Sequence, residues 1–349
     1  MTFVSSRLKH SLSQFSTSLA CVIACISFLA PLPALASPLV LKFSHVVAEE
    51  TPKGQAALEF KRLVESRSKG KVKVEVYPES VLYKDKEELE ALQLGAVHIL
   101  APSLAKFGQL GIRDFEVFDI PYLFTNPQTL SEVVNGEIGR GLLNQLGERG
   151  IKGLAFWDNG PKVISSNNPV RLPSDLKGKR FRIQPSRTLE AQVEELGATP
   201  IAMPFSEVYE ALESGFVDST ENPPSNFYSR KMYKVQRYLT VTNHGHLGYA
   251  VIVNKKFWEN LPRDTRELLE ACLKASTVKN NEISAKMNQD AMNEIRKRKL
   301  AQVIDLTPEQ LMAWKTKLQP VRRKSETWID EDLIEKVRRT DARHSPSLK

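Results

Sequence analysis

One arginine in the middle of the chain has a setting that suits the binding of an anion. Arg182 stands between Phe181 and Ile183, so on a strand its side chain would face away from both apolar neighbours. A guanidinium can hold a carboxylate through two parallel hydrogen bonds, a geometry that the lysine ammonium does not reproduce. The alternative, from the residues alone, is an arginine on the exposed face of a strand.

Two further residues could complete such a site. Asn222 carries an amide that both donates and accepts hydrogen bonds, although it also suits a turn before Pro223. Phe205 could form a wall of the site, or it could pack in a core. The residues themselves leave both choices open.

Signals of catalysis and of metal binding are weak. The chain has no G-x-S-x-G, no glycine-rich phosphate loop and no H-E-x-x-H. His244 and His246 are two positions apart, which could suit a metal, but no third or fourth ligand follows at ligand spacing. Cys272 lies on an apolar helical face, which favours a buried structural role over a reactive one. We therefore expect no catalytic residue, no metal and no cofactor.

An internal repeat indicates the elements that must position these residues. The pattern E-A-L-x-x-G-x-V occurs over 90–97 and again over 210–217. Each copy is typical of a helix end, closed by a glycine that can adopt the left-handed conformation, followed by an apolar strand. A strand, a helix and a strand precede each copy, over 41–45, 52–66 and 71–77 in the first and over 180–184, 188–196 and 199–203 in the second.

The repeat predicts two βαβαβ units, each with a parallel sheet. Open parallel sheets bind ligands at the carboxyl ends of their strands. In the first unit these ends fall at His45 and Ser103, and in the second unit they fall at 182–184 and Asn222. Two such edges facing each other would form a cleft lined by these residues.

The rest of the chain favours an α/β protein of two domains. Apolar strands over 153–159 and 249–254 suit crossovers that connect the domains and act as hinges. A helical pattern from about 263 to 299, without Gly or Pro, is longer than an ordinary helix and should lie across both domains. We expect domain I over 37–160 plus about 249–287, domain II over 161–248 plus about 288–337, and a polar, disordered tail over 338–349.

The N-terminus predicts export. Arg7 and Lys9 precede an apolar stretch over 19–35 that ends in Ala34-Leu35-Ala36, as in a secretory signal peptide over 1–36 cleaved after Ala36. The alternatives are a retained membrane anchor and lipidation at Cys25, whose preceding residues resemble a lipobox. No later stretch is long and apolar enough to span a membrane.

The charge excludes one class of partner. The formal net charge is +8, but it is mixed in sign along the chain and lacks the basic stripe with interleaved aromatics that nucleic-acid binding needs. A mildly positive field favours small anionic ligands, although a generic solvated surface explains it equally well. We expect no nucleic-acid partner.

Several motifs resemble one family of binding proteins. The segments M-P-F-S-E-V-Y-E-A-L from 203 and V-D-S-T-E-N-P from 217 are closely similar to the signature of the solute-binding subunits of TRAP (tripartite ATP-independent periplasmic) transporters. The similarity extends from about 41 to 264, and W-D-N-G from 157 resembles the DctP branch, which binds C4-dicarboxylates such as malate, succinate and fumarate. The resemblance implies a two-domain periplasmic binding protein (type II-like, Venus flytrap) with crossover hinge strands.

The resemblance also implies roles for single residues. Arg182 matches the carboxylate-clamping arginine of the family, Asn222 its ligand-contacting asparagine and Phe205 its cleft phenylalanine. Lys84 and His246 are candidates for a second ligand carboxylate, with exposed charge and strand-end packing as equally good accounts. The predicted ligand-binding residues are Arg182, Asn222, Phe205, His45, Ser103, Asn159, Trp157, Lys162, Lys84 and His246.

Two details depart from the family pattern. Ser219 stands where a glycine is frequent, and Pro204 stands where an alanine is frequent. Both positions lie near the expected cleft. These differences therefore bear on which carboxylate is bound more than on the expectation that the ligand is a carboxylate.

The function that the resemblance implies is transport. A periplasmic subunit would deliver a carboxylate to the small and large membrane subunits of a TRAP transporter, driven by an ion gradient and not by ATP. The same type of protein could instead present its ligand to a membrane sensor kinase. An enzyme on the same scaffold is disfavoured because the chain shows no nucleophile and no poised acid–base pair.

Overall fold

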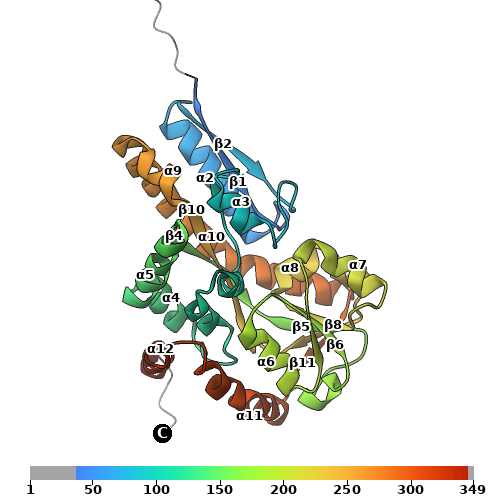
Figure 1. Ribbon diagram of the computed structural model, residues 1–349. Coiled ribbons are helices and arrows are strands. Elements are labelled where there is room, and N and C mark those ends of the chain that lie inside the picture. The colour runs from blue at the N-terminus through green and yellow to red at the C-terminus, as the bar shows by residue number, and fades with distance from the viewer. Residues whose placement is uncertain (1–36, 345–349) are drawn as a thin grey trace, which may run out of the picture. The chain divides into compact units, whose positions relative to one another are not determined.

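Two β-sheets and the helices around them make up the computed structural model, which describes residues 37–344 (Figure 1). The predicted signal peptide lies outside the described residues. The strands are β1 (Leu39–Ser44), β2 (Val72–Tyr77), β3 (Ile99–Leu100), β4 (Ile151–Pro161), β5 (Val163–Ser166), β6 (Arg180–Ile183), β7 (Thr199–Ala202), β8 (Ser219–Asn222), β9 (Tyr238–Val241), β10 (His246–Asn254) and β11 (Gln302–Asp305). The α-helices are α2 (Pro52–Arg67), α3 (Glu88–Gln93), α4 (Pro127–Asn135), α5 (Glu137–Gln145), α6 (Arg187–Glu195), α7 (Val208–Glu213), α8 (Pro224–Ser229), α9 (Lys255–Asn260), α10 (Arg263–Lys297), α11 (Pro308–Ser325) and α12 (Glu331–His344).

The first βαβαβ unit starts the first sheet, which has the strand order β2-β1-β3-β10-β4. β1 pairs in parallel with both β2 and β3. Between β1 and β2, helix α2 begins after Thr51, whose side chain accepts a hydrogen bond from the Gly54 N–H, and Pro52 occupies the first helical position. Phe60 and Val64 of α2 are buried in the core beneath this sheet.

The second βαβαβ unit has the same pattern in the second sheet, of order β11-β9-β5-β8-β6-β7. β6 pairs in parallel with β7 and β8, as β1 does with β2 and β3. The repeat glycines Gly95 and Gly215 follow α3 and α7 at φ of 77° and 70°, a left-handed conformation that glycine adopts without steric cost. The two units predicted from the repeat are confirmed.

Each predicted βαβαβ unit is parallel, but each whole sheet is mixed because further strands join it antiparallel. β10 runs antiparallel to β3 and β4, and β5 runs antiparallel to β8 and β9. A parallel neighbour needs a long crossover connection. β5 and β10 instead enter their sheets directly from a strand of the other sheet, and this direct entry accounts for their antiparallel direction.

The chain passes between the sheets twice, at adjacent places. β4 ends at Pro161 in the first sheet and β5 starts at Val163 in the second, while the return runs from β9 to β10. The two passages touch, because the Lys162 N–H donates to the Gly245 carbonyl at 2.9 Å. The predicted crossover strands are confirmed, and their action as hinges stays a prediction.

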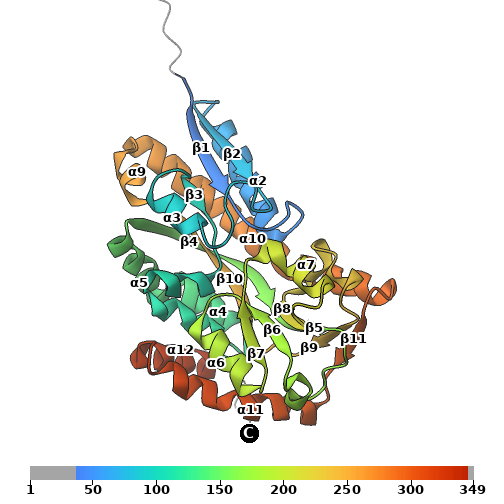
Figure 2. The same cartoon turned by 45° about the vertical axis from the view of Figure 1, so that its right-hand side comes forward.

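Helix α10 is the predicted long helix, and it contacts parts of both sheets. Figures 1 and 2 show it, in orange, running past the two sheets. Asn280 donates to the Asp158 carbonyl at 2.8 Å. Asn288 donates to the Asn159 carbonyl at 2.6 Å and accepts from the Ser225 N–H, which belongs to α8, at 3.0 Å. The helix therefore connects β4 to α8. The predicted domain limits themselves stay a prediction.

The C-terminal segment is helical through His344, so the disordered tail expected over 338–349 is wrong for its described part. α12 buries Ile334 and Val337 in the core that also contains Val133 of α4. The polarity of this segment is misleading because its charges have partners: the His344 ring bonds to Glu132 at 2.7 Å. Residues 345–349 lie outside the described part.

Two further expectations concern single features. Cys272 is fully buried on α10, as predicted, and burial raises the pKa of its thiol. Within residues 37–344, no helix has both the length and the apolar character needed to cross a membrane.

Candidate ligand-binding site

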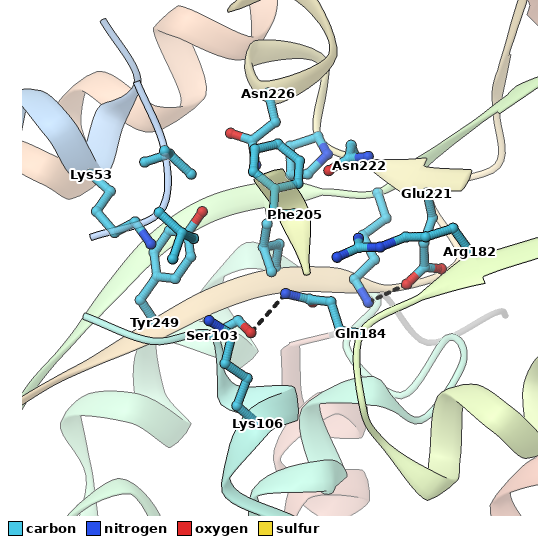
Figure 3. Close-up of a pocket in the computed structure, with 15 residues that line it drawn as sticks. Lys53, Ser103, Lys106, Arg182, Gln184, Phe205, Glu221, Asn222, Asn226 and Tyr249 are labelled. Carbon is cyan, nitrogen blue, oxygen red and sulfur yellow. Dashed lines mark hydrogen bonds and ion pairs between the residues drawn. The ribbon is translucent and has the colours of Figure 1, made fainter. Parts of the chain in front are cut away.

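A polar cavity lies where the parallel strands of both sheets end, as the repeat predicts (Figure 3). Its walls combine the loops after β1, β3 and β7 with the ends of β6 and β8, the β4–β5 crossover and β10. The lining residues are Val46, Val47, Lys53, Ser103, Lys106, Lys162, Arg182, Gln184, Phe205, Glu221, Asn222, Pro223, Asn226, Leu247 and Tyr249.

Arg182 is the central cation of this cavity. It is 2% exposed, and burial lowers the pKa of its guanidinium to about 10. Its Nε and one terminal nitrogen donate to the Met203 carbonyl, at 3.2 and 2.9 Å. Within residues 37–344 it has no carboxylate at ion-pair distance, although Asp85 and Glu221 act on it from further away. The guanidinium edge that remains can receive an anion.

Phe205 and Asn222 also line the cavity. The Phe205 ring centroid is 5.9 Å from the Arg182 guanidinium carbon, and its backbone N–H donates to Asp85 at 2.8 Å. Among the described residues, the side-chain amide of Asn222 donates only a long hydrogen bond, to the Met232 sulfur at 3.8 Å. Its hydrogen-bonding capacity is therefore largely open to a ligand.

Ser103 connects the cavity walls formed by the first and the second βαβαβ unit. Its hydroxyl accepts a hydrogen bond from the Gln184 amide at 2.7 Å, and the two residues follow β3 and β6 respectively. Figure 3 shows this bond across the cavity. The Ser103 hydroxyl is bonded to an amide and not to a general base, so it lacks the activation that a nucleophile needs.

Lys162 lines the cavity but already has partners. Its ammonium lies 2.6 Å from Glu221 and 3.4 Å from Asp119, and all three side chains are buried. Burial alone would raise the pKa of Glu221, but Lys162 and His244 hold it well below its usual range. Burial raises the pKa of Asp119 to about 6. This cluster fixes the crossover in place and leaves Lys162 little capacity for a ligand charge.

Lys106 is paired in the same way. Its buried ammonium contacts both Asp85 and Glu88. Burial alone would lower the pKa of Lys106, but the two carboxylates raise it. Like Lys162, it is a cation whose charge the protein itself compensates.

Sequence reasoning missed Lys53 and Tyr249. Lys53 is 1% exposed in the first turn of α2, and its ammonium lies 3.7 Å from the centroid of the Tyr249 ring and 3.0 Å from the Ala101 carbonyl. A lysine near a helix start ordinarily indicates a solvated side chain, so only the tertiary contact identifies it. The motif Thr51-Pro52-Lys53 gives no signal of burial.

Three of the predicted residues lie in the protein interior without lining this cavity. His45 is buried, neither ring nitrogen has a hydrogen-bond partner among the described residues, and burial together with the Lys53 charge lowers its pKa to about 3. Trp157 packs beside Phe43 in the core, with the ring centroids 5.9 Å apart. Asn159 donates to Asn226, itself a lining residue, at 3.2 Å. These residues support the walls.

Two others lie elsewhere. Lys84 is exposed and pairs with Glu207 at 3.1 Å. His246 pairs with Asp158 and lines separate cavities. Neither lines the cavity around Arg182.

The two closely spaced histidines do not share a site. His244 bonds to Glu221 and Thr242, whereas His246 bonds to Asp158. Throughout residues 37–344, no three His, Cys, Asp or Glu side chains converge as metal ligands.

The arrangement defines a binding protein of the α/β class with a ligand cavity between two sheets. The model of the DctP family, bacterial extracellular solute-binding protein family 7, matches residues 43–327. The chain belongs to this family. Members of the family bind solutes, which confirms the prediction of a binding protein and not an enzyme.

Individual relatives are similar over nearly their whole length. The C4-dicarboxylate-binding periplasmic protein DctP of Rhodobacter capsulatus is 52% identical over 317 residues, which cover 91% of this chain and 95% of that protein. A TRAP periplasmic solute-binding protein from Shewanella oneidensis with bound succinate has a TM-score of 0.85 and 41% identity, over 87% of this chain and 99% of the other. One from Pseudomonas aeruginosa with bound L-malate has a TM-score of 0.80 and 41% identity, over 82% and 100%. The predicted fold is thereby confirmed.

Proposed function

We propose that this protein is the periplasmic solute-binding subunit of a TRAP transporter and that it captures a C4-dicarboxylate in the cavity around Arg182. The observation that carries the proposal is a buried guanidinium that lines the cavity and whose hydrogen bonds, among residues 37–344, all go to the Met203 carbonyl. A buried charge without a counter-ion is costly, and a ligand carboxylate would supply one. The similarity to succinate- and malate-bound relatives supports the same ligand class.

The remaining steps follow from this role. The protein is exported through cleavage after Ala36, binds its ligand in the periplasm and passes it to the small and large membrane subunits. Arg182 clamps one carboxylate, Phe205 covers it, and Asn222 and Ser103 contact the ligand by hydrogen bonding. No group in this scheme carries out chemistry on the ligand.

Thermal denaturation of ligand-stripped protein tests the ligand class. A ligand that binds only the folded protein stabilises it by RT ln(1 + [L]/Kd), or about 2.7 kcal/mol at a hundredfold excess over Kd. We expect succinate, malate or fumarate to raise the melting temperature, whereas sugars and free amino acids have little effect. The proposal fails if none of the three dicarboxylates changes it.

A further inference from the structure

The four basic side chains of the cavity fall into two kinds. Lys106 and Lys162 each contact two buried carboxylates. Lys53 and Arg182, in contrast, have no carboxylate at ion-pair distance within residues 37–344, and their direct polar partners are backbone carbonyls. The cavity therefore presents two cations whose charges no contacting side chain compensates.

These two cations come from different elements. Lys53 belongs to α2 in the first βαβαβ unit, whereas Arg182 lies on β6 in the second. Figure 3 shows Lys53 and Arg182 on opposite sides of the cavity, with Phe205 and the Ser103–Gln184 pair drawn between them. A ligand with an anionic group at each end matches this arrangement, because each end would meet one cation.

The Lys53 ammonium is fixed in position, but part of its hydrogen-bonding capacity is unused among the described residues. Its ammonium has three donors; one reaches the Ala101 carbonyl, and the Tyr249 ring faces the charge at 3.7 Å. A cation–π contact offsets part of the desolvation cost but accepts no full hydrogen bond. Its position in the first turn of α2 adds the positive end of the helix, which favours an anion there.

We propose that Lys53 forms a second carboxylate subsite and selects a dicarboxylate over a monocarboxylate. The inference rests on the proposed function, because it assigns the far end of the ligand that Arg182 clamps. The charged groups around Lys53 are Lys106, Glu88 and Asp85. The titratable groups His45, which burial keeps neutral, and Tyr249 also face it.

The protonation of Lys53 gives the subsite a measurable property. Burial and the charge of Lys106 lower the pKa of Lys53 to about 7 in the absence of a ligand, despite Glu88 and Asp85. A carboxylate at the ammonium would favour the charged form and raise the pKa again. Dicarboxylate binding at about pH 8 should therefore take up nearly one proton.

Calorimetric titration with succinate and with its monoamide tests the subsite. The two ligands have nearly the same shape, and they differ in one negative charge. In the native protein we expect succinate to bind at least about 30-fold more tightly than the monoamide. Lys53→Met should lose at least about 30-fold for succinate and should no longer distinguish the two ligands. Lys73→Met, the same substitution at an exposed lysine of β2 outside the cavity, should behave as the native protein.

Proton uptake gives a second measurement that needs no variant. Titration of the native protein at about pH 8 in two buffers of different ionisation enthalpy should show uptake with succinate and none with the monoamide. The inference is wrong if native protein binds succinate no more tightly than the monoamide, or if folded Lys53→Met binds succinate within threefold of the native protein. If the native protein binds no C4-dicarboxylate, the proposed function fails, and the subsite fails with it.

Discussion

Replacing Arg182 by lysine tests the carboxylate clamp most directly. The substitution keeps the positive charge and removes the planar fork. In the native protein Nε and one terminal nitrogen are occupied by the Met203 carbonyl, which fixes the plane of the guanidinium beside the Phe205 ring. A lysine ammonium has no such plane and cannot form a bidentate pair with a carboxylate.

The expected loss of ligand affinity follows from the burial of the Arg182 side chain. At 2% exposure, water cannot replace a lost contact. Loss of one partner of a desolvated, hydrogen-bonded charge pair costs about 2 to 5 kcal/mol, or roughly thirty to several thousand fold in Kd. We expect Arg182→Lys to lie in this range for the best dicarboxylate, although the charge is unchanged.

Arg180→Lys is the matched control. Arg180 lies on the same strand two positions earlier, and its guanidinium pairs with Asp218 at 3.0 Å on the exposed surface. Exposed pairs contribute little, and this residue does not line the cavity. Calorimetric titration of the native protein and both variants with one dicarboxylate gives the comparison, and circular dichroism checks that each variant is folded.

Two results would refute the reasoning about Arg182. The first is a folded Arg182→Lys protein that binds within threefold of the native one, because the fork would then contribute nothing. The second is a larger loss in Arg180→Lys, because the wrong residue of β6 would then be assigned to the cavity.

Two further predictions concern stability and export. Glu221→Gln should lower the free energy of unfolding by about 3 kcal/mol near pH 7, because it removes a buried carboxylate from Lys162 and His244, while Glu267→Gln in an exposed pair should change little. The folded pKa of Glu221 is lowered, so its contribution to the free energy of unfolding is present above about pH 4.5 and is lost as the pH falls further. Urea denaturation should therefore show that the difference between native and Glu221→Gln protein shrinks in acid. A difference that stays constant with pH would contradict the assignment. N-terminal sequencing of the exported protein should begin at Ser37, and either a lipidated Cys25 or an intact Met1 in the membrane fraction would contradict cleavage after Ala36.

Much of the fold could be predicted because its signals are local. The repeated helix ends need glycines with positive φ, and Gly95 and Gly215 are visible in the sequence for that reason. The alternation of a strand predicted that Arg182 faces away from Phe181 and Ile183, which lie in the core, but it left open whether Arg182 is buried or exposed. Helix ends and the alternation of a strand are determined by residues close together in the sequence, and periodicity and turn chemistry reveal such local relations.

The rest could not be predicted because it depends on contacts between distant segments. Lys53 and Lys84 are the same residue type, each near a helix start, and only the fold buries one and exposes the other. The antiparallel entry of β10 and the helical α12 likewise depend on partners elsewhere in the chain. Composition described the C-terminal segment correctly as polar, but polarity does not exclude a helix with a buried stripe.

The paired crossovers have a mechanical consequence. A single strand linking two bodies would allow one body to rotate about any axis relative to the other. Here two strands pass side by side and are joined by the bond from the Lys162 N–H to the Gly245 carbonyl, while α10 forms a third tie through Asn288. If the crossovers act as hinges, as the sequence predicts, we expect this linkage to resist torsion and to bend mainly about one axis. Bending about one axis would move Lys53 and Arg182 toward each other along the same path each time. A ligand would therefore meet both cations in the same relative positions.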